Sequence, residues 1–279
     1  MSGGVPGALE ALFVRADYTQ EPISEGARDH LLAIECPVAI EINGIAFAVM
    51  MASPLDLEDF VTGFLMAEGL ARAEQVGEIA LSRVDKGAWG QGMVARVSLP
   101  SECLGPVLER ARRRIGDSSC GICGMDGIET ALRPLPVLEP SLRLSRAAVG
   151  AALEAMRVRQ VLGQATRATH AAAFCTSEGE VLLLREDVGR HNALDKLVGA
   201  LARQGRDAGA GFIVMTSRCS YELVEKTVRA GCALLVTISA PTDLAVRRAE
   251  AAGLTLCVVA RGDSMLMTQV DGHGPFIDD

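Results

Sequence analysis

The stretch GFIVMTSRCSYELVEKTVRAGCALLVTISAPTDLAVRRAEAAGLTLCVVA, residues 211–260, contains the clearest fold signal in the chain. Three short apolar runs, each long enough for one buried strand, alternate with two segments that have the apolar spacing of amphipathic helices. Strict alternation of this kind is typical of a largely parallel sheet with helices packed on it. We therefore predict an α/β domain around these residues.

The residues before this stretch extend the same domain. THAAAFCTSEGEVLLLRED, residues 169–187, has two apolar runs around a Ser-Glu-Gly turn, and residues 141–163 predict a helix. The next helix is predicted at residues 191–205, where one face is apolar through Leu194, Leu197, Val198 and Leu201. Upstream, RPLPVLEP has three prolines and no periodicity, so we place a domain boundary there, between a domain 1–135 and a domain 136–279.

The first domain is expected to be smaller and of mixed α+β type. CPVAIEINGIAFAVM, residues 36–50, alternates apolar and polar positions around Asn43-Gly44, which predicts a hairpin. SPLDLEDFVTGFLMAEGL follows as a helix, with Ser53 as its expected N-cap, Pro54 at the first helical position and Gly69 at its end. MVARVSL, residues 93–99, predicts a further strand.

Composition excludes several classes of protein. With 279 residues, 49% hydrophobic and 22% charged, the chain can bury a core and is not intrinsically disordered. A net charge of −8 argues against non-specific binding to nucleic acid or to a membrane surface. No segment approaches the roughly 18 apolar residues of a membrane span, and residues 1–30 contain no signal-peptide core, so we expect a cytoplasmic protein.

Unusual polar side chains follow the predicted strands of the second domain. In a parallel sheet these loops gather at one edge, where free backbone N–H groups and helix dipoles favour anions. EDVGRHNALDK, which joins a strand to a helix, is either an elaborate helix cap or a polar pocket at the helix start. The side chains expected to face one crevice are Arg190, His191, Asn192, Arg218, Ser220, Thr242 and Arg261.

Eight cysteines are too few for a disulfide scaffold in a chain of this length. Cys175, Cys232 and Cys257 lie in apolar runs and are expected in the core, whereas Cys120 and Cys123 form the only CxxC pair, within GDSSCGICGMDG. We predict that Cys120 is a nucleophile that carries sulfur as a persulfide, with Cys123 as its partner.

Other interpretations of this pair stay open at this point. A structural zinc site would need two further ligands, and no second pair exists, so no metal is expected. A zinc nucleobase deaminase would need a His-x-Glu motif, and none of the four histidines has one. Thiol–disulfide exchange and a pair of inert loop cysteines are the remaining alternatives.

Together these motifs resemble the FdhD family of formate dehydrogenase accessory sulfurtransferases. The resemblance runs from about residue 36 to about residue 265 through CPVAIEINGIAFAVMMASPLDLEDFVTGFLMAEG, SSCGICG, THAAAF, EDVGRHNALDK, SRCSYELVEK, SAPTDLAVRRA and TLCVVARGD. It implies a protein that takes sulfur from a cysteine desulfurase and passes it to the molybdenum cofactor, a bis-molybdopterin guanine dinucleotide, for insertion into formate dehydrogenase. The implied fold is a three-layer, cytidine-deaminase-like sheet domain, and the implied assembly is a homodimer.

The resemblance also implies roles for single residues. Cys120 would carry the persulfide and Cys123 would assist. The last strand loop would hold the guanine-nucleotide end of the cofactor, which a guanine nucleotide could mimic, through Val259, Ala260, Arg261, Gly262, Asp263 and Ser264. Arg190, His191 and Arg218 are assigned to this site only because their loops are expected at the same edge of the predicted sheet, and not because of the resemblance. One departure is Thr216-Ser217-Arg218, where the family usually has Ser-Gly-Arg, and serine in place of glycine changes how closely the backbone can approach a ligand. The alternatives are a cofactor-binding chaperone without covalent sulfur chemistry and a thiol–disulfide oxidoreductase.

Overall fold

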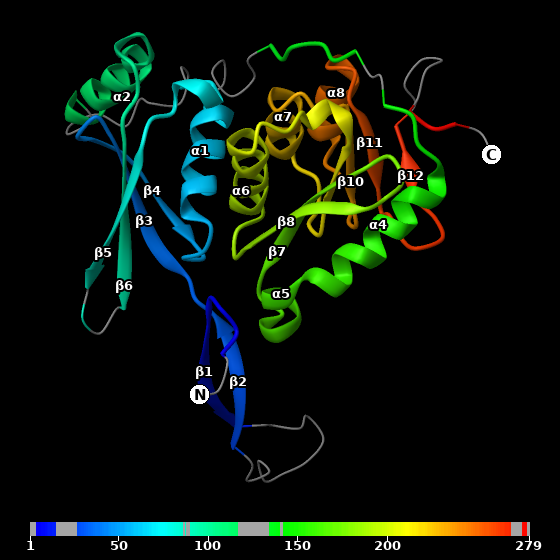
Figure 1. Cartoon of the computed structure of the whole chain (residues 1–279), viewed down its shortest axis with the longest axis horizontal. Helices are drawn as coiled ribbons and strands as arrows, with labels where there is room; N and C mark the ends of the chain where they lie inside the picture. The colour runs from blue at the N-terminus through cyan, green and yellow to red at the C-terminus, as the bar shows by residue number, and fades with distance from the viewer. Residues whose placement is uncertain are drawn as a thin grey trace.

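The computed structural model describes residues 4–14, 27–85, 87, 90–116, 134–139, 142–268 and 275–277. Two sheets stand on either side of a helical layer, and a further helix covers the far face of the larger sheet (Figure 1). Within the described part of the chain, no helix has the length and apolar character needed to cross a membrane.

The N-terminal sheet has four strands in the order β4-β3-β6-β5. The strands are β3 (Cys36–Ile42), β4 (Ile45–Ala52), β5 (Ile79–Asp85) and β6 (Gln91–Val97). Helix α1 (Leu57–Ala67) packs on one face, where Phe60 and Phe64 join alternate side chains of β3 in a continuous core. Helix α2 (Leu104–Gly116) contacts β4, and its Val107 joins the same core.

The C-terminal sheet has six strands in the order β12-β11-β10-β9-β7-β8. They are β7 (His170–Cys175), β8 (Val181–Asp187), β9 (Phe212–Met215), β10 (Leu234–Thr237), β11 (Thr255–Val258) and β12 (Leu266–Met267). Strands β9, β10 and β11 are parallel, as predicted. Strand β7 is antiparallel to both β8 and β9, and β12 is antiparallel to β11.

The prediction of a largely parallel sheet is therefore wrong for the outer strands. The cause is the Ser-Glu-Gly turn, where Gly179 has a φ of 87° and folds β8 back along β7 as a hairpin. Helix α6 then carries the chain across to β9, on the other side of β7. The sheet is mixed, and the likeness to the cytidine-deaminase fold stays a prediction.

Helices cover both faces of this sheet. On one face lies α4 (Arg146–Arg159), followed by the short α5 (Val161–Thr166), and on the other lie α6 (Arg190–Arg203), α7 (Tyr221–Arg229) and α8 (Asp243–Ala251). The apolar face predicted for α6 is confirmed, because Leu194, Leu197, Val198 and Leu201 are all buried. Strand residues alternate between the two cores, as the period of two requires.

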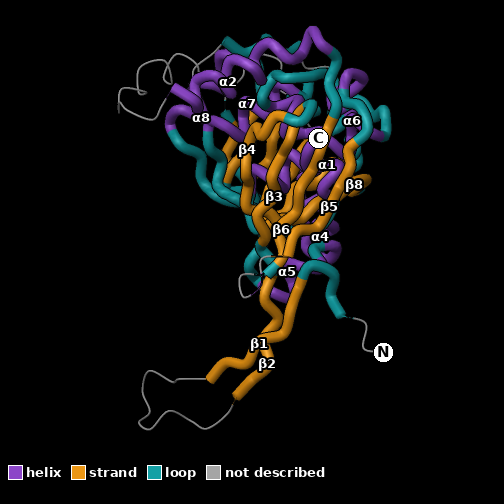
Figure 2. The backbone as a smooth tube through the Cα atoms, turned by 90° about the vertical axis from the view of Figure 1, so that its left-hand side faces the viewer, coloured by secondary structure: helices purple, strands orange, loops and turns teal. Residues whose placement is uncertain are grey.

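A two-stranded antiparallel ribbon, β1 (Ala8–Val14) and β2 (Ala27–Ala33), extends away from the body of the molecule (Figure 2). The predicted hairpin is also present: Asn43 and Gly44, with φ values of 48° and 80°, form the turn between β3 and β4. Glu68 is the C-cap of α1 and Gly69 follows with a φ of 69°, so the predicted end of this helix is confirmed.

The predicted start of α1 is wrong. The helix begins at Leu57, with Asp56 in a left-handed conformation at the N-cap, and Ser53 and Pro54 precede it. Ser53 is fully buried, and its backbone and hydroxyl form hydrogen bonds with the end of β8, the loop after it and α6 instead of with the helix: Asp187, Val188 and Lys196. The Ser53 hydroxyl, which was expected to cap the helix, instead accepts a hydrogen bond from the backbone N–H of Val188, a distant residue that the local sequence does not reveal.

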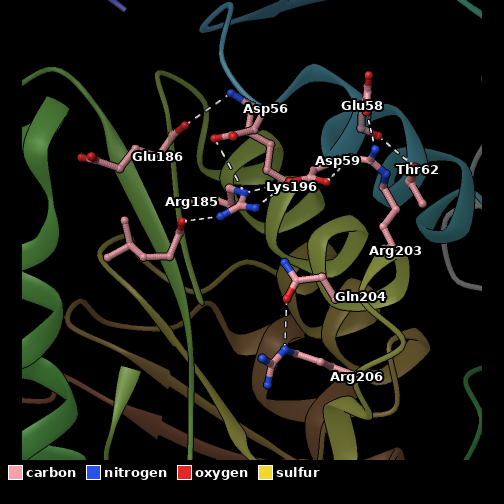
Figure 3. Close-up of polar contacts among 11 residues, drawn as sticks. Asp56, Glu58, Asp59, Thr62, Arg185, Glu186, Lys196, Arg203, Gln204 and Arg206 are labelled. Atoms are coloured by element: carbon pink, nitrogen blue, oxygen red, sulfur yellow. Dashed lines mark hydrogen bonds and ion pairs between the residues drawn. The ribbon is translucent and has the colours of Figure 1, made fainter. Parts of the chain in front are cut away.

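Helices α1 and α6 join the two parts of the chain. Gly63 and Gly199 face each other where the helices cross, and no side chain separates the two backbones there. Arg185 and Arg203 both donate hydrogen bonds to the carboxylate of Asp59, at 2.7 and 2.6 Å (Figure 3). The domain boundary between residues 135 and 136 stays a prediction.

Candidate functional site

Both residues of the CxxC pair, Cys120 and Cys123, lie outside the described residues. The six cysteines that the structure describes are all buried with free thiols: Cys36, Cys103, Cys175, Cys219, Cys232 and Cys257. Burial raises the pKa of Cys175, Cys219, Cys232 and Cys257 to about 12. The core role predicted for Cys175, Cys232 and Cys257 is confirmed, and such thiols are poor nucleophiles.

The EDVGRHN loop is organised around one buried carboxylate. Asp187 Oδ1 accepts hydrogen bonds from the backbone N–H of Gly189 at 2.8 Å and from Asn192 Nδ2 at 3.0 Å. Its Oδ2 accepts one from the backbone N–H of Ser53 at 2.9 Å and lies 2.6 Å from Lys196 Nζ. Asp187 and Lys196 are fully buried, so the loop between β8 and α6 is held in one position.

This anchoring places Arg190 and His191 at the start of α6. Helix α6 begins without a side-chain cap, and Arg190 is its first residue. The Nε of Arg190 is buried, and no hydrogen-bond partner for it exists among the described residues. A cation at the positive end of a helix dipole is unfavourable by itself, so an anion bound here would satisfy both the arginine and the free helix N–H groups.

His191 turns toward α7. Its Nε2 lies 2.8 Å from Glu222 Oε2 and 3.4 Å from Ser220 Oγ. Burial lowers the pKa of His191, with Arg190 acting in the same direction and Glu222 opposing it. Arg218 is exposed in the loop after β9, and no described carboxylate forms an ion pair with it.

The predicted cofactor loop lies at the end of β11. Val259 has a φ of 51°, which is rare for a β-branched residue and marks a strained backbone at this position. Arg261 donates from Nη1 to the carbonyl oxygens of Ile238 and Ala260, and its backbone N–H bonds Ser264 O at 2.7 Å. These bonds close a tight turn that exposes residues 261–264.

Two cavities lie between this loop and α4, and both are lined by Gly150 and Gly262. The first, of about 340 Å³, is lined by Arg146, Ala147, Val149, Gly150, Arg261, Gly262, Asp263, Ser264, Met265 and Met267. The second, of about 330 Å³, includes Gln160, Thr216, Ile238 and Ala260. A Cβ on Gly150 would lie 2.9 Å from Gly262 O, so glycine is needed for α4 to approach the loop this closely.

Among the described residues, the side chains that were expected to face one crevice do not share a single cavity. Arg261 lines the cavities on the α4 side of the sheet, whereas His191 lines a separate cavity of about 340 Å³ with residues of α1 and α7. Asn192 and Thr242 have structural roles, because Asn192 bonds Met51 O and Thr242 caps α8.

Sequence reasoning missed Arg146 and Gly150. A signal for Arg146 was present: it directly follows the N-cap Ser145, and an arginine in the first turn opposes the helix dipole. Arg190 repeats this pattern at the start of α6. The approach of Gly150 to Gly262 has no such signal, because the two residues are far apart in the sequence.

Comparison with known proteins decides the family. The model of the FdhD/NarQ family matches residues 33–269, which includes every candidate site residue named above. The chain belongs to the FdhD/NarQ family. A protein of Variovorax paradoxus (strain S110) called "Sulfur carrier protein FdhD" is 44% identical over 94% of this chain and 92% of its own length. A protein of the same name from Xanthomonas euvesicatoria pv. vesicatoria (strain 85-10) is 48% identical over 83% of this chain and 81% of its own length.

A solved structure supports the FdhD/NarQ fold. It is described as a putative formate dehydrogenase accessory protein from Desulfotalea psychrophila and matches with a TM-score of 0.70. The match covers 94% of this chain and 96% of that one, at 24% sequence identity. The mixed α/β architecture is thus shared over almost the whole length of both chains.

One pH effect follows from the cavity that His191 lines. Burial raises the pKa of Asp195 to about 6, from an ordinary value of 3.8, although Lys226 Nζ lies 2.6 Å away and opposes the rise. The carboxyl group of Asp195 therefore binds its proton more tightly in the folded FdhD/NarQ protein than in the unfolded chain. We expect the unfolding free energy of the wild type, relative to Asp195→Asn, to fall by about 3 kcal/mol as the pH rises from about 4 to about 6.

Urea unfolding of both proteins at several pH values between 4 and 8 measures this difference. Above pH 6 the difference should be level, because Asp195 is then ionised in both states. A difference that rises with pH through this range would contradict the assignment and indicate that the ion pair with Lys226 outweighs burial.

Proposed function

We propose that this chain is a cytoplasmic sulfurtransferase that accepts sulfur from a cysteine desulfurase on Cys120 and delivers it to the molybdenum cofactor for formate dehydrogenase. Family membership and the names of the curated relatives support this proposal. The observation in this chain that carries it is the burial of all six described cysteines, four with a pKa of about 12. The CxxC pair is left as the source of a reactive thiolate.

The transfer balances without an added oxidant. The Cys120 thiolate attacks the outer sulfur of the donor's persulfide, so the donor S–S bond breaks, a new S–S bond forms on Cys120 and the donor cysteine leaves as a thiolate. For release, the Cys123 thiolate attacks Cys120 Sγ and expels hydrosulfide to the acceptor. The two cysteines supply the two electrons and end as a disulfide, which a cellular dithiol reduces.

The substrate is proposed to be the bis-molybdopterin guanine dinucleotide form of the cofactor, bound as cargo. Its phosphate groups need cations and backbone N–H donors, and two helices of this chain, α4 and α6, begin on an arginine. The strained turn from Val259 to Ser264 and the cavities beside it favour the guanine-nucleotide end there. Arg190, His191 and Arg218 are proposed to bind other anionic groups, and a homodimer is proposed as the assembly.

The sulfur-carrier role is tested by intact-protein mass spectrometry after incubation with a cysteine desulfurase and cysteine. Wild-type protein should gain one or more sulfur atoms that a reductant removes, and Cys120→Ala should gain none. The buried-cysteine variant Cys103→Ala is the matched control and should load like wild type.

The other interpretations predict different results in this assay and in assays of formate dehydrogenase maturation and thiol–disulfide exchange. No gain with a competent desulfurase, or an equal gain in Cys120→Ala, contradicts the persulfide role. Maturation of formate dehydrogenase by Cys120→Ala would indicate a non-covalent cofactor chaperone. Catalytic thiol–disulfide exchange without sulfur gain would indicate an oxidoreductase.

The nucleotide site is tested separately. Guanosine diphosphate is expected to bind the wild type, and Arg146→Ala and Arg261→Ala are each expected to weaken binding about tenfold or more, because each removes a charge-assisted hydrogen bond to phosphate. Isothermal titration calorimetry measures this. Arg247→Ala, on the exposed face of α8, is the control and should bind normally. Equal binding by all four proteins would place the nucleotide elsewhere.

A further inference from the structure

A cavity of about 340 Å³ lies where α1, α6 and α7 meet, and it shares no lining residue with the two cavities beside Gly262. The three helices lie side by side in the helical layer between the two sheets (Figure 1). The volume is at the small end of the range of about 300–1,000 Å³ that is usual for ligand pockets. The cavity therefore suits a small molecule.

One face of α7 supplies most of the charged lining. Its four charged residues at i, i+3, i+4 and i+7 lie on one side of the helix, and all of them line the cavity: Glu222, Glu225, Lys226 and Arg229. The first and the last are about 10.5 Å apart along the helix axis. This face therefore runs from an acidic end to a basic end.

The acidic end of the cavity lies beside the start of α6. Glu222 Oε2 is 2.8 Å from His191 Nε2, and the Glu222 side chain is 44% exposed, so a ligand can reach its carboxylate. Burial lowers the pKa of His191, so the ring is neutral at pH 7.5 and does not cancel the charge of Glu222. Glu225, by contrast, forms an ion pair with Arg248. Glu222 is therefore the carboxylate of α7 that can bind a positively charged group.

The basic end of the cavity lies just past the end of α1. Arg229 Nη1 is 3.9 Å from the position that a Cβ on Gly69 would take, and Arg229 forms no ion pair with a carboxylate in the described part of the chain. Lys226 Nζ donates hydrogen bonds to both carboxylate oxygens of Asp195, at 2.6 and 2.8 Å. The third N–H of this ammonium group has no acceptor among the described residues. A ligand carboxylate at this end would accept hydrogen bonds from two cations.

The wall of the cavity that faces α7 is apolar. Met50 from β4 and Phe64 and Ala67 from α1 line it, and the ring of Tyr221 lies at the Glu222 end. Thioether and aromatic groups make favourable contacts with aliphatic and sulfur-containing side chains. A ligand that satisfies the whole cavity therefore needs a positive group, a carboxylate and an apolar side chain.

We propose that this cavity binds a free α-amino acid with an apolar side chain. The ammonium and carboxylate groups of an α-amino acid are about 3 Å apart, and a hydrogen bond of about 2.9 Å at each end extends the span to about 9 Å. That span is close to the distance of about 10.5 Å between Glu222 and Arg229 along α7. The ammonium group binds Glu222, the carboxylate binds Lys226 and Arg229, and the side chain packs against Phe64. A simple anion or a simple cation would satisfy only one end.

Isothermal titration calorimetry with L-methionine at pH 7.5 tests the proposal. The wild type is expected to bind it with a dissociation constant of about 0.1–1 mM, as suits a ligand of so few atoms. Methionine methyl ester lacks the carboxylate and N-acetylmethionine lacks the ammonium group, so each should bind about tenfold more weakly or worse. L-aspartate should bind more weakly still, because its charged side chain would face the apolar wall.

Four variants locate the binding. Arg229→Gln and Glu222→Gln should each raise the dissociation constant about tenfold or more, because each removes one charged end. Ala67→Phe fills the cavity without changing its charge and should abolish binding. Arg247→Gln, on the exposed face of α8, is the matched control and should bind like the wild type. Thermal unfolding without ligand shows that each variant is folded.

The outcomes that overturn this inference are separate from those that concern sulfur transfer. A wild type that does not bind L-methionine at concentrations well above 1 mM has no amino-acid site of this kind. Equal affinity for methionine and its methyl ester, or unchanged affinity in Arg229→Gln or Glu222→Gln, would show that the two charged ends are not used. Cys120 takes no part in this binding, so a failure of sulfur loading contradicts the sulfur-carrier role and leaves the amino-acid site standing.

Discussion

Replacing Lys196 by methionine is expected to lower the unfolding free energy by about 3–5 kcal/mol. Lys196 and Asp187 are both fully buried, and their charged atoms are 2.6 Å apart. Taking one partner away leaves the other charge in a low-dielectric interior, and this costs far more than the net contribution of the intact pair. Asp187→Ala is expected to have a similar effect and also releases the backbone N–H groups of Ser53 and Gly189.

Urea unfolding measures the loss, and two further variants identify its cause. Arg247→Ala breaks the exposed ion pair with Asp243 and should change the free energy by less than about 1 kcal/mol. The double variant Asp187→Asn with Lys196→Met should be more stable than Lys196→Met alone, because no unpaired charge remains. Equal losses in the single and double variants would show that lost packing, and not an unpaired charge, causes the effect.

This buried pair also links stability to the proposed function. Asp187 fixes Gly189 and Asn192, which flank Arg190 and His191. The same carboxylate and Lys196 bind Ser53 at the end of β4, so the N-terminal sheet and the start of α6 are held by one polar centre. A change in either partner should therefore weaken binding of an anionic cofactor even in protein that remains folded.

The sequence predicts elements with a regular period far better than it predicts what joins them. The apolar period of α6 and the three strands after it were predictable, because each pattern is local and repeats over many residues. The start of α1 was not, because Ser53 is used by Asp187 and Lys196, more than a hundred residues away. The antiparallel hairpin of β7 and β8 was marked by its turn, although the alternation downstream suggested parallel strands.

The candidate site divides in the same way. Motifs predicted the turn from Val259 to Ser264 and the loop at Arg190, but the partners that form the cavities come from α4. A cavity needs two surfaces, and single-sequence reasoning locates only the one that contains the motif. The arginines at helix starts are the exception, since Arg146 and Arg190 both oppose a helix dipole within their own segment.

Replacing Gly63 by alanine is expected to lower the unfolding free energy by about 3 kcal/mol or more. A Cβ at this position would overlap the carbonyl oxygen of Asp195 and lie 2.9 Å from the backbone nitrogen of Gly199. A Cβ at Gly199 would overlap Asp59 O in the same manner. Neither helix backbone can give way locally, so α1 and α6 must separate, and overpacking of this kind is costly.

The matched control is Gly105→Ala in α2, where no atom lies within 4 Å of the new Cβ. There the substitution should leave stability unchanged or raise it by up to about 1 kcal/mol, because alanine has the higher helix propensity. Separation of α1 from α6 would also pull Asp59 from Arg185 and Arg203, so Gly63→Ala should reduce the cooperativity of urea unfolding. If Gly63→Ala and Gly105→Ala unfold at the same urea concentration, the two helices do not cross in direct backbone contact.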